Sequence, residues 1–343
     1  MKKRCCALAL LICGLLPGIS VAQKSAVDYM QKVETAQSKV TEDFLIYVSA
    51  VAHGKSARKV DKRRKDLLSA VSQARSQMKH LVPFEKTDTT LRAAAFTYLN
   101  ILYVLLKEDY GKIVDMEEIA EQSYDNMEAY LNIQEEANKK LEDAGDRLEA
   151  ATKTFAADNN VTLLEQKDAM SKKAEKVETV NKYYHKIYLI YFKSMKQEAY
   201  MIAALDKKDV NAVEQNKNAL LKNSEEGLAK LIDLKGFEND QTLVADCKKL
   251  LQFYQKEATE KMPVLVDFML KNQTFVSAKS KFDSGSKSKE DTDAYNKAVA
   301  AINDAGATYN KTNAELNQTR SKLNTDWDNG VKNFMDKHIP QSK

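Results

Sequence analysis

The sequence predicts an all-α protein that consists of two tandem antiparallel four-helix bundles, and three observations lead to this fold class. The chain of 343 residues contains only 4 Pro and 10 Gly, so few positions interrupt a helix. Charged residues make up 30% of the chain and hydrophobic residues 43%, which suits long helices with polar outer faces. In addition, one helix–turn–helix elbow occurs twice in similar sequence, which indicates an internal duplication.

The two elbows comprise residues 81–91 and 234–243, and each passes between two helical patterns through a Pro or a Gly. Asp88 and Asp240 stand where the N-cap of the following helix is expected, because their side chains can accept hydrogen bonds from its first turn. A Phe a few residues earlier in each elbow is expected to fold back on that helix as a hydrophobic staple.

The two copies align with a constant offset and without a gap from the first helix to the elbow. The pairs that share this offset include Tyr47 with Tyr200, Leu67 with Leu220 and Phe84 with Phe237. We therefore expect a first bundle in residues 23–160 and a second bundle in residues 161–343.

The first copy is expected to form four helices, near residues 26–52, 56–82, 88–121 and 124–158. Apolar residues recur there at helical spacing, for example Leu91, Ala95 and Tyr98. Short loops force sequential helices to run antiparallel. The second helix is basic between Arg58 and Lys65, whereas the third and fourth are acidic, so we expect them to attract one another. Binding of this basic segment to an anionic surface is the alternative.

The second copy opens with the most apolar helix of the chain, which carries Tyr184, Tyr188 and Tyr191. Such a wide stripe is typical of a helix that faces a core. The alternative function of these three tyrosines is to line a pocket for an apolar or sugar-like ligand.

The second copy is also longer than the first, because the stretch from Leu243 to Phe334 exceeds the matching stretch from Leu91 to Phe155. Divided between two antiparallel helices, this surplus predicts a helical-hairpin arm around residues 264–310. The residues expected at its interaction seam include Phe275, Phe282, Tyr295, Ile302 and Tyr309.

Polar Asn313 and Arg320 are expected to weaken that seam, and Pro263 to kink the helix where the arm departs. A weak, protruding two-helix seam can receive a helix from a partner. A solvated arm without a partner remains the alternative.

Residues 1–22 have the pattern of a secretory signal peptide. Basic residues precede an apolar stretch from Cys5 to Leu16, and Ser20-Val21-Ala22 offers a cleavage site, so the mature chain is expected to start near Gln23. A lipid anchor at Cys13 is the alternative, although Ile12 departs from the usual lipoprotein pattern. We therefore expect a periplasmic or cell-surface protein, with no transmembrane segment in the mature chain.

Cleavage would also remove three basic residues and reduce the formal charge from +4 to +1, so nothing in the charge indicates a nucleic-acid partner. None of the four His has an Asp or Glu three or four residues away, so neither di-iron nor zinc helix motifs are present. Cys247, the only Cys beyond the signal, is expected to be a buried and inert thiol. We expect no cofactor, no metal and no enzymatic activity.

The first copy resembles the LIC-type surface proteins, a family of exported helical bacterial proteins. The resemblance lies in Pro83-Phe84-Glu85, in Leu91-Arg92-Ala93-Ala94, in residues 110–115 and in Phe155-Ala156-Ala157, and it covers most of residues 26–160. It implies an envelope or surface location and carries over no functional residues.

These observations favour an exported, non-catalytic interaction or scaffold protein that binds another envelope protein. The alternative function is small-ligand binding at the aromatic helix of residues 180–195.

Overall fold

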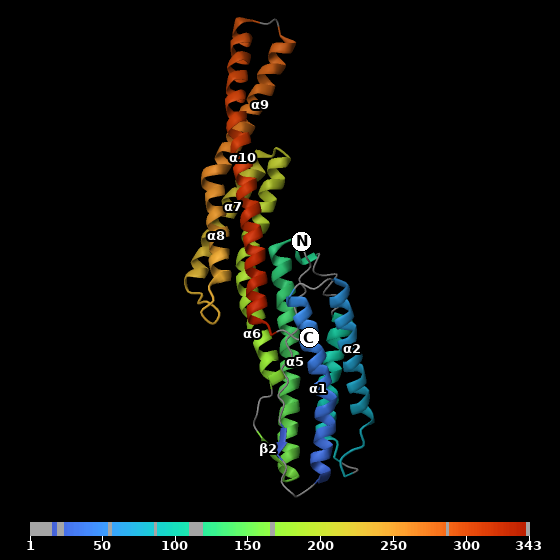
Figure 1. Cartoon of the computed structure of the whole chain (residues 1–343). Coiled ribbons are helices and arrows are strands. Elements are labelled where there is room, and N and C mark those ends of the chain that lie inside the picture. Colours follow the sequence, from blue (N-terminus) through green and yellow to red (C-terminus); the bar gives the residue numbers. More distant parts are fainter. Residues whose placement is uncertain are drawn as a thin grey trace. The chain divides into compact units, whose positions relative to one another are not determined.

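The computed structural model describes residues 16–18, 24–53, 57–85, 88–109, 119–164, 169–285 and 288–340, and it confirms the all-α fold class (Figure 1). The helices are α1 (Lys24–Ala52), α2 (Ala57–His80), α3 (Thr90–Val104), α5 (Tyr124–Asp158), α6 (Ala169–Asp206), α7 (Val210–Ile232), α8 (Thr242–Lys256), α9 (Met262–Ser284) and α10 (Lys289–His338). Two π-helical turns, η1 (Leu105–Asp109) and η2 (Glu257–Lys261), directly follow α3 and α8. None of the described helices combines the length and apolar character that crossing a membrane requires.

Two short strands are the non-helical elements among the described residues. β1 (Leu16–Gly18) pairs antiparallel with β2 (Thr162–Leu164), with Pro17 opposite Leu163. β1 belongs to the segment expected to be a signal peptide, and the rest of that segment, together with Cys13 and the cleavage site, lies outside the described residues.

The chain forms two compact units. The first unit contains the residues up to His185 together with those from Lys332 onward, and the second contains Lys186–Val331. The expected boundary at residue 160 therefore differs from the observed one. The reason is that α6 and α10 are continuous helices of 38 and 50 residues, and each contributes side chains to both units.

In the first unit, α2 packs against α1 and α3, and α3 packs against α5. The observed ends of α1 and α5 agree with the expected helices to within two residues. The helix expected at 88–121 instead stops at Val104 and passes into η1, and residues 110–118 lie outside the described part.

The two elbows have the same backbone hydrogen bonds. The N–H and C=O groups of Phe84 and Asp88 exchange two bonds of 2.9 Å, and those of Phe237 and Asp240 exchange bonds of 3.0 and 2.8 Å. The Asp side chains do accept from the first turn, since Oδ1 of Asp88 binds the N–H of Thr90 at 2.8 Å. Each Asp lies one residue before the N-cap residue of its helix. The N-cap residues are Thr89 in α3 and Gln241 in α8.

The ring of Phe84 is part of an aromatic cluster. Its ring lies 5.4 Å from the ring of Tyr29 on α1 and 5.0 Å from that of Phe155 on α5, so it joins an aromatic cluster between those helices. The elbow thus positions this side chain in the core of the unit.

In the second unit, α7 packs against α8, and the arm consists of the distal parts of α9 and α10, which extend together beyond the other helices of the unit (Figure 1). Ring pairs hold its two helices together: Phe268 with Tyr309 at 4.5 Å, and Phe282 with Tyr295 at 4.8 Å. Pro263 lies in the first turn of α9, immediately after η2.

Candidate functional site

Three charged side chains from different elements meet in the interior of the second unit. Glu198 lies on α6, Glu257 is the first residue of η2, and Arg320 lies on α10. The Arg320 guanidinium donates through Nε to Oε1 of Glu198 at 2.6 Å and through Nη2 to Oε1 of Glu257 at 2.5 Å. Its Nη1 donates to Oδ1 of Asn317 at 2.6 Å. We call Glu198, Glu257 and Arg320 the ionic cluster.

The helical spacing explains how these side chains reach the core. Glu198 follows Tyr191 by two turns of α6, and Arg320 precedes Trp327 by two turns of α10. The rings of Tyr191 and Trp327 lie 4.7 Å apart, so both helices direct these faces at each other. Glu257 follows the fully buried Tyr254 by one turn.

Burial determines the electrostatics of the ionic cluster. Glu257 is 0% exposed, Glu198 is buried as well, and the Arg320 side chain is 17% exposed. The pKa of Glu257 is raised to about 8, mainly by desolvation and then by the negative charge of Glu198, while Arg320 opposes both. The raised pKa favours a proton on Glu257 at neutral pH, so that Arg320 faces one carboxylate charge and not two.

The ionic cluster is surrounded by unused hydrogen-bonding capacity. Four buried oxygens have no partner among the described residues: Ser194 Oγ, Tyr254 Oη, Glu257 Oε2 and Asn324 Oδ1. Ser194, Tyr254 and Asn324 lie three or four residues from a charged member of the cluster, on the same face of its helix. Buried polar atoms are normally paired, so these four oxygens add further polar groups to an already charged interior.

If the two copies expected from the sequence are aligned, the positions of the ionic cluster match apolar residues of the first unit. When Leu91 is aligned with Leu243, the burial pattern of α3 recurs in α8, with Leu91, Ala95 and Leu102 buried in one helix and Leu243, Cys247 and Tyr254 in the other. In the same alignment Glu257 corresponds to Leu105, and each of these two residues begins a π-helical turn.

Arg320 and Glu198 have apolar counterparts too. When Phe155 is matched with Phe334, Arg320 corresponds to the buried Leu141. The two residues of the expected pair Tyr47 and Tyr200 differ in burial, since Tyr47 is 1% exposed and Tyr200 is 41% exposed.

If Tyr47 is aligned with Met201 instead, the buried positions of α1 coincide with those of α6. In this alignment Glu198 corresponds to the buried Phe44.

The three tyrosines expected to bind a ligand do not form one group. Tyr184 belongs to the first unit, whereas Tyr188 and Tyr191 belong to the second and have ring centroids 6.3 Å apart. Tyr184 and Tyr191 are buried and Tyr188 is half-buried, and Tyr191 packs on Trp327. Core packing therefore accounts for these rings, and ligand binding by them stays a prediction.

The seam residues of the arm largely contact one another. Tyr295 packs on Phe282, and the centroid of Phe275 lies 6.1 Å from that of Tyr295. Tyr309 packs on Phe268, and Ile302 is half-buried.

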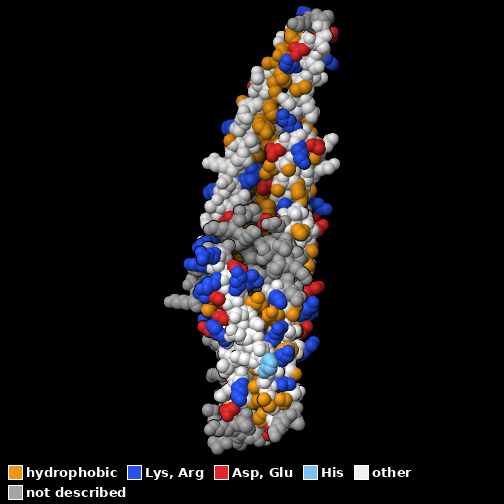
Figure 2. Space-filling view, turned by 90° about the vertical axis from the view of Figure 1, so that its right-hand side faces the viewer, with side chains coloured by type: hydrophobic (Ala, Val, Ile, Leu, Met, Phe, Trp, Pro, Cys, Tyr) orange, Lys and Arg blue, Asp and Glu red, His pale blue; other side chains and the backbone are white. Residues whose placement is uncertain are grey.

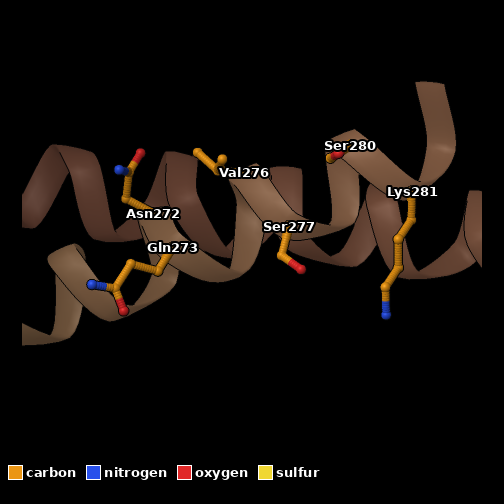
Figure 3. A pocket seen from close by; sticks show the side chains of 6 residues that line it. All are labelled: Asn272, Gln273, Val276, Ser277, Ser280 and Lys281. Carbon is orange, nitrogen blue, oxygen red and sulfur yellow. The ribbon is translucent and has the colours of Figure 1, made fainter. Parts of the chain in front are cut away.

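On the surface of α9, by contrast, there is an open hollow (Figure 3). The residues that line it are Asn272, Gln273, Val276, Ser277, Ser280 and Lys281. We call these six residues the α9 face.

The Cys247 thiol and the His185 imidazole are both held in their neutral forms by burial. Burial raises the pKa of the Cys247 thiol to about 12 and lowers the pKa of His185 to about 4. Within the described residues, no group of three or more His, Cys, Asp or Glu side chains could hold a metal ion.

Sequence reasoning missed the ionic cluster and treated Arg320 only as a flaw in the arm seam. One signal was present, because Glu198 lies in phase with the apolar stripe of its helix and not on the polar face. Comparison of the chain with protein-family models, with curated proteins and with solved structures found no match. The assignment of function therefore depends on the geometry of the two units.

Proposed function

We propose that this chain is an exported, non-catalytic interaction protein whose arm binds a helix of another envelope protein through the α9 face. The observation that carries the proposal is the exposure of apolar side chains beside that hollow: Val276 is 57% exposed and Leu270 is 48% exposed. The aromatic residues of the arm are engaged in its own seam, so they do not account for this second apolar surface.

The form of the surface supports a helical partner. Gln273, Val276 and Ser280 recur at steps of three and four residues, which is the spacing that a docked helix contacts. Ser277 and Ser280 are small, so a partner backbone can approach closely. Figure 2 shows hydrophobic side chains as a narrow band along the arm, flanked by charged ones, as expected for an apolar contact with a polar rim.

Matched charge insertions test this proposal in the protein's own host. Val276→Glu/Ser280→Glu places two carboxylates on the α9 face, and Asn303→Glu/Ala307→Glu places two on exposed positions of α10 with the same spacing. A photo-reactive residue at Gln273 should cross-link one envelope protein in the wild type and in the α10 variant, but not in the α9 variant. Equal cross-linking in all three chains would remove the α9 face as the binding surface.

The tandem organisation of the chain is part of the same proposal. The shared hydrogen bonds of the two elbows, and the π-helical turns that directly follow α3 and α8, support descent of both halves from one duplicated segment. On this proposal the second copy gained the arm as its binding element.

A second candidate function is the binding of a small polar ligand in the core of the second unit. The four unpartnered oxygens beside the Tyr191–Trp327 pair favour it. A ligand that binds the native state must raise the melting temperature, and Tyr191→Ala should abolish that rise. A small-molecule library that leaves the melting temperature unchanged would eliminate this candidate.

A further inference from the structure

The ionic cluster lies at the base of the arm and joins it to a helix that is not part of it. Glu257 begins η2, the turn at which α8 passes into α9, and Arg320 lies on α10, the second arm helix. Glu198 is on α6, which takes no part in the arm. One guanidinium therefore fixes the position of both arm helices against the rest of the unit.

The charge balance of the cluster depends on one proton. The groups that face the Glu257 carboxyl are Glu198 from α6 and Arg320 from α10, with Tyr254 of α8 close by. The remaining ion pair at this level, Lys261 with Glu315, is exposed and spans η2 and α10. With Glu257 neutral, Glu198 and Arg320 compensate each other. With Glu257 ionised, one buried negative charge has no counter-charge.

A hydrogen bond between the Glu257 and Glu198 carboxyl groups helps to keep a proton on Glu257. Oε1 of Glu257 accepts from Arg320, whereas Oε2 is buried and has no partner among the described residues. A proton on the Glu257 carboxyl removes its charge and leaves Oε1 able to accept from Arg320. An ionised carboxylate would instead bury a charged oxygen without any donor, which is among the most unfavourable arrangements in a protein interior.

We propose that the ionic cluster is a proton-operated lock at the base of the arm. With a proton on Glu257, the cluster holds η2 and α10 against α6. When Glu257 releases that proton to bulk water, the uncompensated charge loosens η2 and the adjoining part of α10, and the arm becomes free to change its angle. The inference does not depend on the identity of any arm partner.

The sign of the pH dependence follows from burial. The pKa of Glu257 is raised above its ordinary value of 4.5, to about 8, first by desolvation and then by Glu198. The folded chain therefore binds more protons than the unfolded chain between these two values, and its stability falls as the pH rises through that window. The lock is closed at acidic and neutral pH and opens under mildly alkaline conditions.

Hydrogen–deuterium exchange of the full chain tests the lock, with η1 as an internal control. η1 has the same π-helical form but begins with Leu105, which cannot titrate. Between about pH 6 and about pH 9, exchange in η2, corrected for its intrinsic rate, should rise about ten-fold relative to η1. In Glu257→Gln, which keeps an uncharged side chain at every pH, the ratio of the two rates should stay constant.

A second variant keeps the test valid if Glu257→Gln fails to fold. Glu257→Leu copies the apolar side chain of Leu105 and should likewise abolish the pH response, with α10 still protected near Arg320. An unchanged pH response in either folded variant would overturn the proposal, and so would an equal rise in η1 and η2. The proposal would also be overturned if the exchange rate of η2 changed with the alkali cation in the buffer and not with the pH. That result would indicate a cation site.

Discussion

Arg320 and Glu257 are joined by a hydrogen bond of 2.5 Å between Nη2 and Oε1, although 63 residues separate them in the sequence. Because Arg320 also binds Glu198, one guanidinium contacts two buried carboxyl groups. The free energy of the second unit therefore depends strongly on which member of the cluster is removed.

Arg320→Leu should destabilise the second unit by about 3–5 kcal/mol, because it leaves the buried Glu198 without a counter-charge and Glu257 without its hydrogen-bond donor. Urea unfolding followed by circular dichroism measures this loss. Lys261→Met is the matched control, since it removes a cation from an exposed pair between η2 and α10 and should change stability by less than about 1 kcal/mol. Similar losses in both variants would contradict the assigned role of Arg320.

Replacing the whole cluster by the residues of the first unit should have the opposite effect. The variant Glu198→Phe/Glu257→Leu/Arg320→Leu removes all three desolvation penalties together, so it should be as stable as the wild type or more stable by about 1–4 kcal/mol. Its melting temperature should also lose the decline between neutral and alkaline pH. A triple variant as unstable as Arg320→Leu would show that the two units pack differently at these positions.

The helices and the elbows could be predicted from the sequence because their signals are local. Apolar spacing and turn residues place the ends of α1 and α5 to within two residues, and the Asp side chains of both elbows do bind the first helical turn. The division into units could not be predicted in this way. It depends on how two long helices share their side chains between two cores, and no short stretch of sequence encodes that.

The ionic cluster was missed for a related reason. Glu198, Glu257 and Arg320 lie in separate helical patterns, and each looks like an isolated polar residue at a core-facing position. They become one site only when the relative rotation and register of α6, η2 and α10 are known. For the aromatic helix, the sequence pattern grouped residues that the structure separates. Tyr184 and Tyr191 share one apolar stripe of α6 but belong to different units.

His53 and Asp336 form the contact by which the end of α10 holds α1 in the first unit, with Nδ1 and Oδ1 2.5 Å apart. Burial opposes ionisation, but hydrogen bonds from Lys332 and His53 still hold the pKa of Asp336 below its ordinary value of 3.8. Its contribution to stability is therefore present above about that pH and disappears as the pH falls through the depressed value.

Asp336→Asn should accordingly lower the stability of the first unit by about 1 kcal/mol at neutral pH, a modest value because the carboxylate is partly exposed. The difference from the wild type should vanish in strong acid. Thermal unfolding at both pH values measures it. Lys332→Gln keeps the His53 contact and should cost less, so an equal loss in both variants would assign the effect to Lys332.

Two helical glycines provide a test of packing, because a methyl group would meet different surroundings at each. At Gly306 on α10, an added Cβ would lie 3.6 Å from the ring of Phe268, an ordinary contact in the arm seam. Gly306→Ala should therefore stabilise the arm by about 0.5–1 kcal/mol through reduced backbone entropy of the unfolded chain. At Gly227 on α7, an added Cβ would lie 2.9 Å from Cδ1 of Leu251, so overpacking should cancel or reverse that gain.

Hydrogen exchange of the arm and thermal unfolding of the second unit should thus separate the two alanine variants. Slower exchange in α9 and α10 of Gly306→Ala, without a rise in melting temperature for Gly227→Ala, is the expected result. The ring pair of Phe268 and Tyr309 implies a closed seam between the arm helices. If Gly306→Ala leaves hydrogen exchange in the arm unchanged, that seam is not formed in solution. The α9 face would then lack the rigid support that binding a partner helix requires, so this variant also tests the structural premise of the proposed function.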